Sequence, residues 1–425
     1  MSDASAKPQH APIRQFSMDR GQVVVAGQPL NDLAAGLGHS PFYVYDRAAL
    51  GARMSELRGW FPQVAIHYAM KANPMPDVVR FLGSLADGVD VASLGELRSA
   101  LDAGVDPQHI SFAGPGKGAD ELWAAVEAGV LINVESEQEL NTVAAVAIEQ
   151  QAPARVALRV NPDFELKSSG LRMGGGAKPF GVDFEVAPQV LARMAALRSH
   201  GLEFEGLHIF AGSQSLNAEH VAEALTASYE LAVRLAPHAP APLKVLNLGG
   251  GLGVAYFPGE RHLDLAPISS AMAQIVERAR TDFPGAEVVL ELGRYLVAEA
   301  GLFVTRVVDR KQSRGQIFLV TDGGLNHFLA ASGNFGQVVR KNYPVTTCAA
   351  RVDATDSEPQ VWQRELEQVT VVGPLCTPLD ILADRMWLPK ADVGDWVVVF
   401  QAGAYGLTAS PQQFLSRLHC IEIFK

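Results

Sequence analysis

The sequence predicts a (β/α)8 TIM barrel followed by a mostly antiparallel β domain. Short apolar runs alternate with helical patterns from residue 64 to residue 291. After Gly301, strand-like runs are separated by turns and little helical periodicity remains. With 425 residues, 48% of them hydrophobic and 19% charged, the chain is long enough for two or so globular domains.

The expected barrel strands are eight apolar runs, near residues 64–70, 88–92, 109–113, 130–134, 155–160, 204–210, 244–248 and 287–291. Helical patterns between the runs, such as 94–101 and 136–140, open with polar capping residues. Eight strands separated by helices within about 250 residues is the count expected of a closed barrel. A doubly wound open sheet is the alternative, but such a sheet usually has fewer strands.

The domain boundaries follow from these patterns. Residues 1–12 are polar and are predicted to form a disordered tail, while 13–40 are expected to add a strand, at 22–25, to the β domain. The barrel is predicted over 41–300 and the β domain over 301–425. The strands expected in the β domain lie at 304–308, 317–321, 369–372, 396–400 and 420–424.

Composition excludes several classes of function. The formal net charge of −11 argues against a general nucleic-acid or anionic-membrane surface. No run of about 18 apolar residues is present to span a bilayer. Cys348, Cys376 and Cys420 lie too far apart for a disulfide framework or a metal cluster. We therefore expect a cytoplasmic protein without a metal site, a nucleic-acid partner or a membrane partner.

Lys71 ends the first apolar run, AIHYAMK at 65–71. A lysine that a buried strand delivers to the mouth of a barrel is expected to be desolvated, which lowers its pKa and leaves a neutral amine that can attack a carbonyl. The alternative is a lysine whose ammonium group simply extends into solvent.

Other unusual residues also fall at predicted strand ends, where a barrel places its active site. They are Asp90, Arg159, His208, Phe210, Ser213, the run Gly249–Gly251, Glu291, Gly293 and Arg294. Successive glycine amides can approach and bind a phosphate, and barrels often bind phosphate after strands seven and eight. A lone Gly-Gly-Gly, in contrast, is usually a turn. Glu291 would need a cation beside such a ligand, either a protonated ring nitrogen or a salt-bridge partner within the barrel.

An amine, a phosphate cup and a carboxylate that faces a ring nitrogen together indicate pyridoxal 5′-phosphate. The chain also resembles the barrel-fold (type III) pyridoxal-phosphate decarboxylases, the family of diaminopimelate, ornithine and arginine decarboxylases, whose fold is alanine-racemase-like. The resemblance extends from about Pro41 to Pro411. It rests on YAMKAN (68–73), DVASLGEL (90–97), GSQ (212–214), GGG (249–251), ELGR (291–294), GPLC (373–376) and AGAYG (402–406).

The resemblance implies roles for the matching residues. Lys71 would hold the cofactor as an aldimine, and Glu291 would pair with its ring nitrogen. Cys376, which by itself would be interpreted as a small buried hydrophobe, would reach across a two-fold interface and protonate the carbanion left by CO2. A homodimer with shared active sites is therefore implied. Ser213, Gly250, Gly251, Gly293, Arg294 and Tyr405 would surround the phosphate, and Asp90, Glu96 and Arg159 would support the cofactor.

Departures from the family pattern bear on the substrate. Phe210 stands where relatives carry a histidine that stacks on the cofactor ring, and His208, two residues earlier, is either a polar group near the cofactor or a packed one. Thr377 follows Cys376 where relatives place an acidic residue for the distal end of the substrate. Asp380, in the same segment, and Arg294 remain candidate substrate contacts. An enzyme without charged distal clamps is not expected to prefer a free diamino acid.

These departures make the chain similar to decarboxylases found with exosortase and exopolysaccharide genes, and to those that act on an aminoacyl group, such as glutamyl, carried as a thioester on an acyl carrier protein. A thioester has no free distal carboxylate, in agreement with the neutral Thr377. A candidate basic rim for a carrier consists of Lys167, Arg172, Lys178, Arg340 and Lys341. An ordinary solvated charged surface is the alternative.

Three other functions stay open. The first is a decarboxylase of a free amino acid, of the diaminopimelate type. The second is a racemase, although racemases of this fold favour arginine at the ring nitrogen, where this chain has Glu291. The third is a non-catalytic homologue that regulates an enzyme by heterodimerising, and such a protein is expected to lose its cofactor residues.

Overall fold

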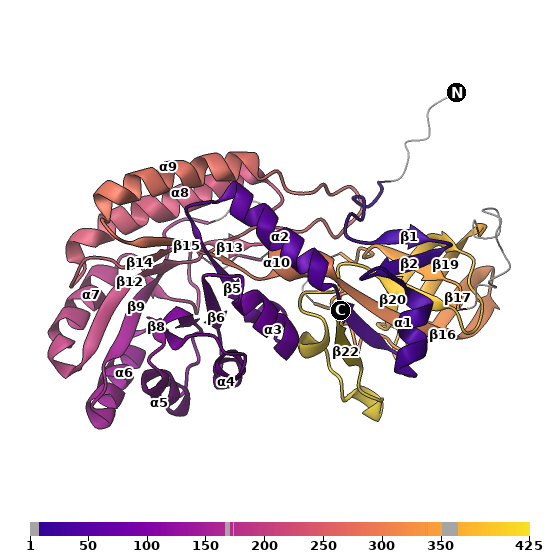
Figure 1. The fold of residues 1–425 in the computed structure, drawn as a ribbon, viewed down its shortest axis with the longest axis horizontal. Helices are drawn as coiled ribbons and strands as arrows, with labels where there is room; N and C mark the ends of the chain where they lie inside the picture. The colour runs from indigo at the N-terminus through magenta and orange to yellow at the C-terminus, as the bar shows by residue number, and fades with distance from the viewer. Residues whose placement is uncertain (1–7, 166–170, 173, 336, 338, 351–363) are drawn as a thin grey trace. The chain divides into compact units, whose positions relative to one another are not determined.

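The structure is a computed structural model that describes residues 8–165, 171–172, 174–335, 337, 339–350 and 364–425. The chain divides into two compact units. We call residues 51–254 and 263–296 the barrel unit. The remaining described residues, up to Leu50, 255–262 and from Val297 onward, form the β unit. Figure 1 labels the helices and strands of both.

The barrel unit contains a closed parallel sheet, which confirms the predicted TIM-barrel fold. Its eight strands are β5 (Ala65–Ala69), β6 (Gly88–Val91), β7 (Ile110–Phe112), β8 (Leu131–Val134), β9 (Ala154–Asn161), β12 (Leu202–Ile209), β14 (Val245–Asn247) and β15 (Glu287–Leu292). The sheet closes because β15 pairs with β5, and β8 pairs with β9. Each strand corresponds to one predicted apolar run, since a strand covered on both faces must be apolar along its length.

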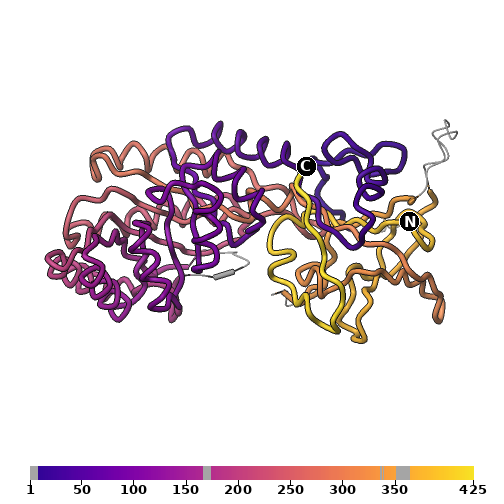
Figure 2. The backbone as a smooth tube through the Cα atoms, turned by 60° about the horizontal axis from the view of Figure 1, so that its bottom comes forward, coloured from indigo at the N-terminus to yellow at the C-terminus, as the bar shows by residue number. Residues whose placement is uncertain are grey.

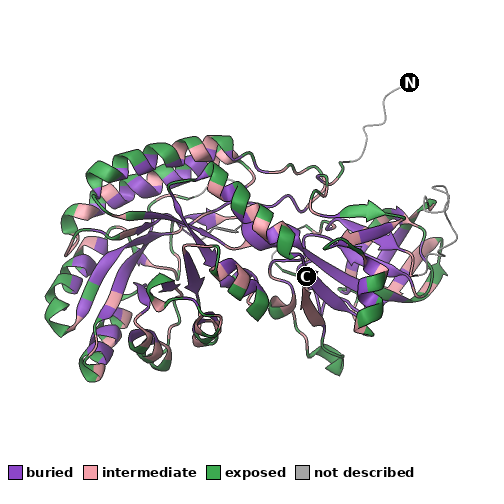
Figure 3. Ribbon diagram, viewed as in Figure 1, coloured by how far each residue is buried: buried purple, intermediate pink, exposed green. Residues whose placement is uncertain are grey.

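Helices cross between successive parallel strands, as parallel pairing requires. They are α3 (Pro76–Gly83), α4 (Leu94–Asp102), α5 (Ala119–Ala128), α6 (Glu137–Gln150), α7 (Ala187–Ala196), α8 (Ala218–Leu235) and α9 (Ala266–Asp282). In addition, α2 (Arg47–Trp60) precedes the first barrel strand and α10 (Arg294–Val297) follows the last. The hydroxyls of Ser93 and Ser136 cap α4 and α6, as the capping pattern predicts. Figure 3 shows the barrel strands largely buried and the outer faces of the long helices exposed.

The β unit contains a mixed sheet. Its strands are β4 (Phe42–Tyr45), β16 (Gly301–Ser313), β17 (Gln316–Thr321), β18 (Val345–Cys348), β19 (Leu366–Val372), β20 (Ile381–Pro389), β21 (Trp396–Val399) and β22 (Ile421–Phe424). Most neighbours are antiparallel, as predicted, but β17 pairs with β19 and β4 with β22 in parallel.

The N-terminal segment lies in the β unit, as expected, but it does not join the larger sheet of that unit. The strand predicted at 22–25 is β2 (Gln22–Val25), but it pairs with β1 (Ser17–Asp19) and β3 (Gln28–Pro29) in a separate sheet that precedes α1 (Leu30–Leu37). The larger sheet instead receives β4, which the prediction assigned to the barrel. Its partners β16 and β22 come from distant parts of the chain, and Figure 2 shows the indigo and yellow ends of the chain within this one unit.

Part of the predicted disordered tail is structured, whereas residues 1–7 lie outside the described residues. Of its residues, 8–12 are described, and Ala11 is buried. The His10 ring lies 2.8 Å from the Asn342 carbonyl, and the Gln9 carbonyl accepts a hydrogen bond from the Gly259 amide at 2.8 Å. In the part of the chain that the structure describes, no helix combines the length and apolarity that a membrane crossing needs.

Candidate active site

Lys71, Glu291 and His208 meet at the carboxyl ends of three barrel strands. Lys71 lies in a turn of 3-10 helix directly after β5, Glu291 lies in β15, and His208 lies in β12. Lys71 Nζ is 3.4 Å from Glu291 Oε1, and His208 Nε2 is 3.0 Å from Glu291 Oε2. One carboxylate therefore faces a lysine on one side and an imidazole on the other.

Glu291 is an ionised, buried carboxylate. Burial by itself would raise its pKa, but the charge of Lys71 and the hydrogen bond from His208 outweigh burial and hold the pKa well below its ordinary value. The second ring nitrogen of His208, Nδ1, is buried without a hydrogen-bond partner among the described residues. An anion fixed in this way can bind a cationic group of a ligand.

The expectation that Lys71 is desolvated is wrong. Its side chain is 45% exposed, because the lysine follows the strand rather than ending inside it. Its amine also lies 5.8 Å from the centre of the half-buried Phe210 ring. The ring pair His208 and Phe210 is tilted, with centroids 6.4 Å apart. Lys71 thus stands at the open mouth of the barrel, between an aromatic face and a carboxylate.

The glycine run after β14 brings two backbones into close approach. Gly249 and Gly251 have φ angles of +69° and +92°, which favour glycine. A Cβ on Gly250 would lie 2.3 Å from the Glu291 carbonyl oxygen. The Asn247 side chain accepts a hydrogen bond from the Gly249 amide at 2.8 Å and so fixes the turn. Only glycine allows the two backbones to approach this closely.

The segment after β12 is tied to the glycine run. Ser213 lies in β13 (Gly212–Ser213), which pairs with β10 (Leu171–Arg172). Beyond it, the Gln214 side chain bonds both the amide and the carbonyl of Val254, and the Ser215 amide donates to the Gly251 carbonyl at 3.0 Å. Sequence reasoning missed this role of Gln214 and Ser215, although both follow a strand end.

Gly293 and Arg294 follow β15 on the side of Lys71. A Cβ on Gly293 would lie 3.0 Å from the Ala69 carbonyl oxygen and from the Ala72 Cβ, in the turn that carries Lys71. Arg294 is the first residue of α10 and is partly buried. The two residues therefore bring the end of β15 against the lysine turn.

Asp90 is bound by a side-chain hydroxyl, whereas Glu96 is bound by a backbone amide at the start of α4. The buried Asp90 accepts a hydrogen bond from Ser111 Oγ at 2.7 Å, and its other oxygen has no partner among the described residues. Glu96 accepts a hydrogen bond from the Ala92 amide at 2.7 Å, beside the Ser93 cap, so it helps to start α4. Burial raises the pKa of Glu96 despite the opposing charge of Lys71.

Arg159 is held by a carboxylate that the sequence analysis missed. Its guanidinium donates to Glu135 Oε1 at 2.7 Å and lies 5.3 Å from the centre of the Phe180 ring. Glu135 also accepts from the Gly114 and Gly181 amides. Burial would raise the pKa of Glu135, but Arg159 and Lys117 lower it. Glu135 directly follows β8, so the strand-end rule that selected Asp90 should also have selected it.

In the β unit, Cys376 lies in the segment between β19 and β20. Its thiol is free and exposed, and Thr377 beside it is partly buried. Asp380 is buried, and its two carboxylate oxygens accept from the Leu325 and Leu375 amides at 2.6 and 2.8 Å. Because both oxygens bind backbone, we reassign Asp380 from substrate contact to a residue that fixes the Cys376 segment.

Tyr405 is also in the β unit. It has a φ of +52°, and its ring lies 6.1 Å from that of Phe335. Of the candidate basic rim, Lys167 and the side chain of Arg172 lie outside the described residues. Lys178 is partly buried, Lys341 is exposed, and Arg340 bonds the Ser332 and Ile381 carbonyls.

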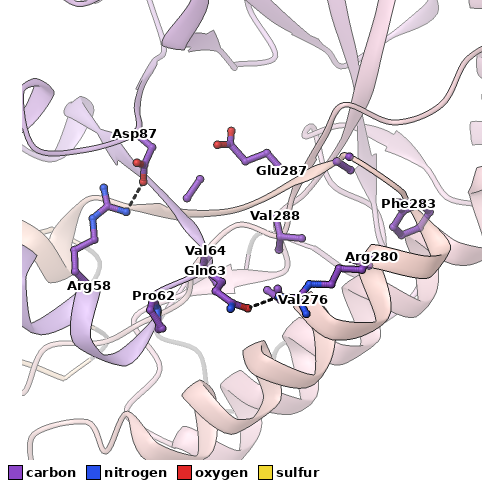
Figure 4. Close-up of a pocket in the computed structure, with 14 residues that line it drawn as sticks. Arg58, Pro62, Gln63, Val64, Asp87, Val276, Arg280, Phe283, Glu287 and Val288 are labelled. Carbon is purple, nitrogen blue, oxygen red and sulfur yellow. Dashed lines mark hydrogen bonds and ion pairs between the residues drawn. The ribbon is translucent and has the colours of Figure 1, made fainter.

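A cavity of about 580 Å³ opens at the amino ends of β5 and β15 and is shown in Figure 4. Its arginines already have partners: Arg58 pairs with Asp87 at 2.5 Å, and Arg280 bonds Gln63 at 3.1 Å. Barrel enzymes carry their catalytic residues at the opposite, carboxyl ends of the strands. This cavity is therefore not the candidate active site.

The chain is similar to known proteins over most of its length. Residues 47–298 match the model of a family described as "Pyridoxal-dependent decarboxylase, pyridoxal binding domain". The chain is 38% identical over 389 residues to the L-glutamyl-[BtrI acyl-carrier protein] decarboxylase of Niallia circulans, covering 91% of this chain and 89% of that protein. It is 32% identical to the diaminopimelate decarboxylase of Aquifex aeolicus, covering 92% and 87%. The crystal structure of diaminopimelate decarboxylase from Helicobacter pylori complexed with L-lysine matches with a TM-score of 0.79 at 28% identity, over 93% of each chain.

Proposed function

The chain belongs to the family of pyridoxal-dependent decarboxylases, and from that premise we propose that it decarboxylates an aminoacyl group carried as a thioester on an acyl carrier protein. The observation that carries the proposal is that the residue directly after Cys376 is uncharged. Thr377 is neutral, and the nearby Asp380 carboxylate is committed to two backbone amides. A free diamino acid would leave its distal charge unpaired there. The relative from Niallia circulans, named for a carrier-linked glutamyl group, supports the same substrate class.

The residues at the barrel mouth fit pyridoxal 5′-phosphate, the cofactor of the family. Lys71 would hold it, and Glu291 would face its ring nitrogen. The glycine run, which has no side chains to block its backbone amides, would bind the phosphate through Gly250 and Gly251, together with Ser213, Gly293 and Arg294. The chemistry that the cofactor supplies when bound is an electron sink for the carbon that loses CO2.

Glu291 and His208 would act as a unit. An ionised Glu291 keeps a neighbouring ring nitrogen protonated, which strengthens its pull on electrons. His208 binds Oε2 and so leaves Oε1, now 3.4 Å from Lys71, directed toward the barrel mouth. This arrangement favours decarboxylation over racemisation, because a carboxylate rather than an arginine lies where the ring nitrogen would bind.

Cys376 is proposed to return a proton to the substrate carbon in the active site of a second copy of the chain. Its exposed thiol and the 58% exposed Leu379 in the same segment are the features that a partner subunit would cover. Asp380 would hold the segment in place through its bonds to the Leu325 and Leu375 amides. The active unit would then be a homodimer with shared sites.

The substrate proposal is tested by CO2 release from the cofactor-loaded enzyme with two matched panels. One panel contains free diaminopimelate, lysine, ornithine, arginine and glutamate, and the other contains aminoacyl thioesters of pantetheine or of a carrier protein. Turnover confined to the thioesters is expected. Rapid turnover of a free diamino acid, with none of a thioester, would contradict the proposal.

A free amino-acid decarboxylase is the second candidate function. The observation in its favour is the 32% identity to the diaminopimelate decarboxylase of Aquifex aeolicus over nearly the whole chain. In that case another residue must pair with the distal charge of the substrate, because Thr377 is neutral. The free amino acids in the first panel distinguish the two candidates directly.

A further inference from the structure

A cavity of about 280 Å³ lies in the β unit beside the residues that hold the Cys376 segment. It is lined by Pro258, Arg340, Lys341, Asn342 and Asp384. Arg340 connects the cavity to that segment, because its Nη2 donates to the Ile381 carbonyl at 2.8 Å. Ile381 directly follows Asp380, whose carboxylate fixes the segment of Cys376 and Thr377.

Arg340 has unused hydrogen-bonding capacity. Its Nε donates to the Ser332 carbonyl at 3.1 Å, but Nη1 is buried without a hydrogen-bond partner among the described residues. Burial lowers the pKa of Arg340, whereas the charge of Asp384 raises it. A buried guanidinium donor without an acceptor is costly, and a ligand that displaced the atoms covering Nη1 would supply the acceptor.

The charge of the cavity favours an anion. Lys341 is exposed, and its ammonium lies 5.5 Å from the centre of the Phe257 ring. Asp384 is the opposing carboxylate, and it already lies 3.5 Å from the Arg385 guanidinium and accepts a hydrogen bond from Thr370. The Arg340 guanidinium and the Lys341 ammonium are then available for an anion. A phosphate ester matches them, because arginine and lysine form charge-assisted hydrogen bonds to its oxygens.

We propose that Arg340 and Lys341 bind the phosphate ester of a phosphopantetheine arm that delivers the substrate thioester. This inference rests on the proposed function and extends it, because it assigns a second contact to the same substrate. A thioester whose phosphate is bound beside the Cys376 segment needs no charged clamp at Thr377. The arm itself then supplies the affinity that free diamino acids obtain from their distal charge.

Calorimetric titration of 4′-phosphopantetheine, pantetheine and inorganic phosphate into the cofactor-loaded protein tests the inference without turnover. Phosphopantetheine is expected to bind more tightly than pantetheine, which lacks the phosphate, and more tightly than inorganic phosphate, which lacks the arm. Equal affinity for phosphopantetheine and pantetheine would overturn the inference. Equal affinity for phosphopantetheine and inorganic phosphate would reduce the cavity to a general anion site and also overturn it.

Two variants locate the binding. Arg340→Lys keeps a cation but removes Nη1, and should weaken phosphopantetheine binding about tenfold. Lys341→Gln, at an exposed position, should weaken it about threefold. Lys311→Gln, which removes an exposed charge on β16 of the same unit, is the matched control and should leave binding unchanged. Unaltered binding in both test variants would assign the phosphate to another site.

The failure of this inference can be distinguished from failure of the proposed function. If pantetheine thioesters were turned over and the phosphate gave no increase in affinity or rate, the proposed phosphate site would be wrong and the proposed substrate class would stand. Glutamyl thioesters of coenzyme A and of a carrier protein share the phosphate ester, so their comparison identifies which donor the enzyme uses. If binding depended on the phosphate but no thioester were turned over, the phosphate site would stand and the proposed decarboxylation of a thioester would be wrong.

Discussion

At the scale of single residues, the site depends on one buried carboxylate with two basic neighbours. Glu291 is buried at the end of β15, and Lys71 and His208 each approach a different oxygen of it. A buried charge is tolerated only when it is paired and hydrogen-bonded. Removal of either basic neighbour would therefore leave the Glu291 carboxylate incompletely paired inside the barrel.

His208→Phe is expected to destabilise the apoprotein by about 1–3 kcal/mol, because Glu291 loses its hydrogen-bond donor inside the barrel. In the holoenzyme kcat should fall more than KM rises, since the imidazole orients Glu291 and does not bind substrate. Urea unfolding and steady-state kinetics measure the two effects. His238→Phe, at an exposed position, is the control. Unchanged stability and unchanged kcat would show that His208 is only a packed residue.

The pH dependence of stability should contain a contribution from Glu291. Although burial would raise the pKa of Glu291, Lys71 and His208 lower it. A carboxylate with a lowered folded-state pKa stabilises the fold above its unfolded pKa of about 4.3 and loses that contribution as the pH falls toward the folded value. The Glu291→Gln apoprotein should therefore lose less unfolding free energy than wild type between about pH 6 and about pH 3. If the unfolding free energies of wild type and Glu291→Gln changed equally with pH, Glu291 would not have a lowered pKa in the folded state.

Asp380→Asn tests whether this carboxylate holds the Cys376 segment. The amide group would direct an N–H toward one of the two backbone donors, which costs about 1–3 kcal/mol. The alkylation rate of Cys376 should also change, because the segment loses one anchor. Asp309→Asn, at an exposed position on β16, is the matched control. An unaltered unfolding free energy and alkylation rate would return Asp380 to the candidate substrate contacts.

At the scale of elements, the site depends on how closely the glycine run after β14 approaches strand β15. The glycine run lies against the carbonyl of Glu291, and Asn247 and Ser215 hold its turn. Backbone segments this close cannot accommodate a side chain without separating.

Gly250→Ala should weaken cofactor binding at least about tenfold, since its Cβ would lie 2.3 Å from the Glu291 carbonyl oxygen and push the two segments apart. Gly59→Ala, in α2, meets nothing within 4 Å and serves as the control. Absorbance of the bound cofactor in a titration of the apoprotein gives both affinities. If Gly250→Ala bound the cofactor with wild-type affinity, the glycine run would not be part of the phosphate site.

At the scale of the whole molecule, the proposed homodimer predicts complementation. Lys71→Ala removes the cofactor amine and Cys376→Ala removes the proton donor, so each variant should be inactive alone. If Cys376 acts in the site of the partner subunit, mixed dimers contain one intact site and should regain part of the activity. CO2 release after the two variants are unfolded and refolded together measures this, and each variant refolded alone is the control. No recovery, with mixed dimers verified by mass, would contradict shared sites.

Local sequence patterns determined the barrel and much of its candidate site. The eight strands were predictable because a strand buried on both faces must be apolar, and Lys71, His208 and Glu291 stood out at their ends. The contact of His208 and Lys71 with one carboxylate was not predictable, nor was the exposure of Lys71. The pairing of β4 with β16 and β22, and the commitment of Asp380 to backbone amides, also required the tertiary structure. Apolar periodicity is a local property of the chain, whereas these contacts join segments far apart in sequence and are decided only when the chain packs.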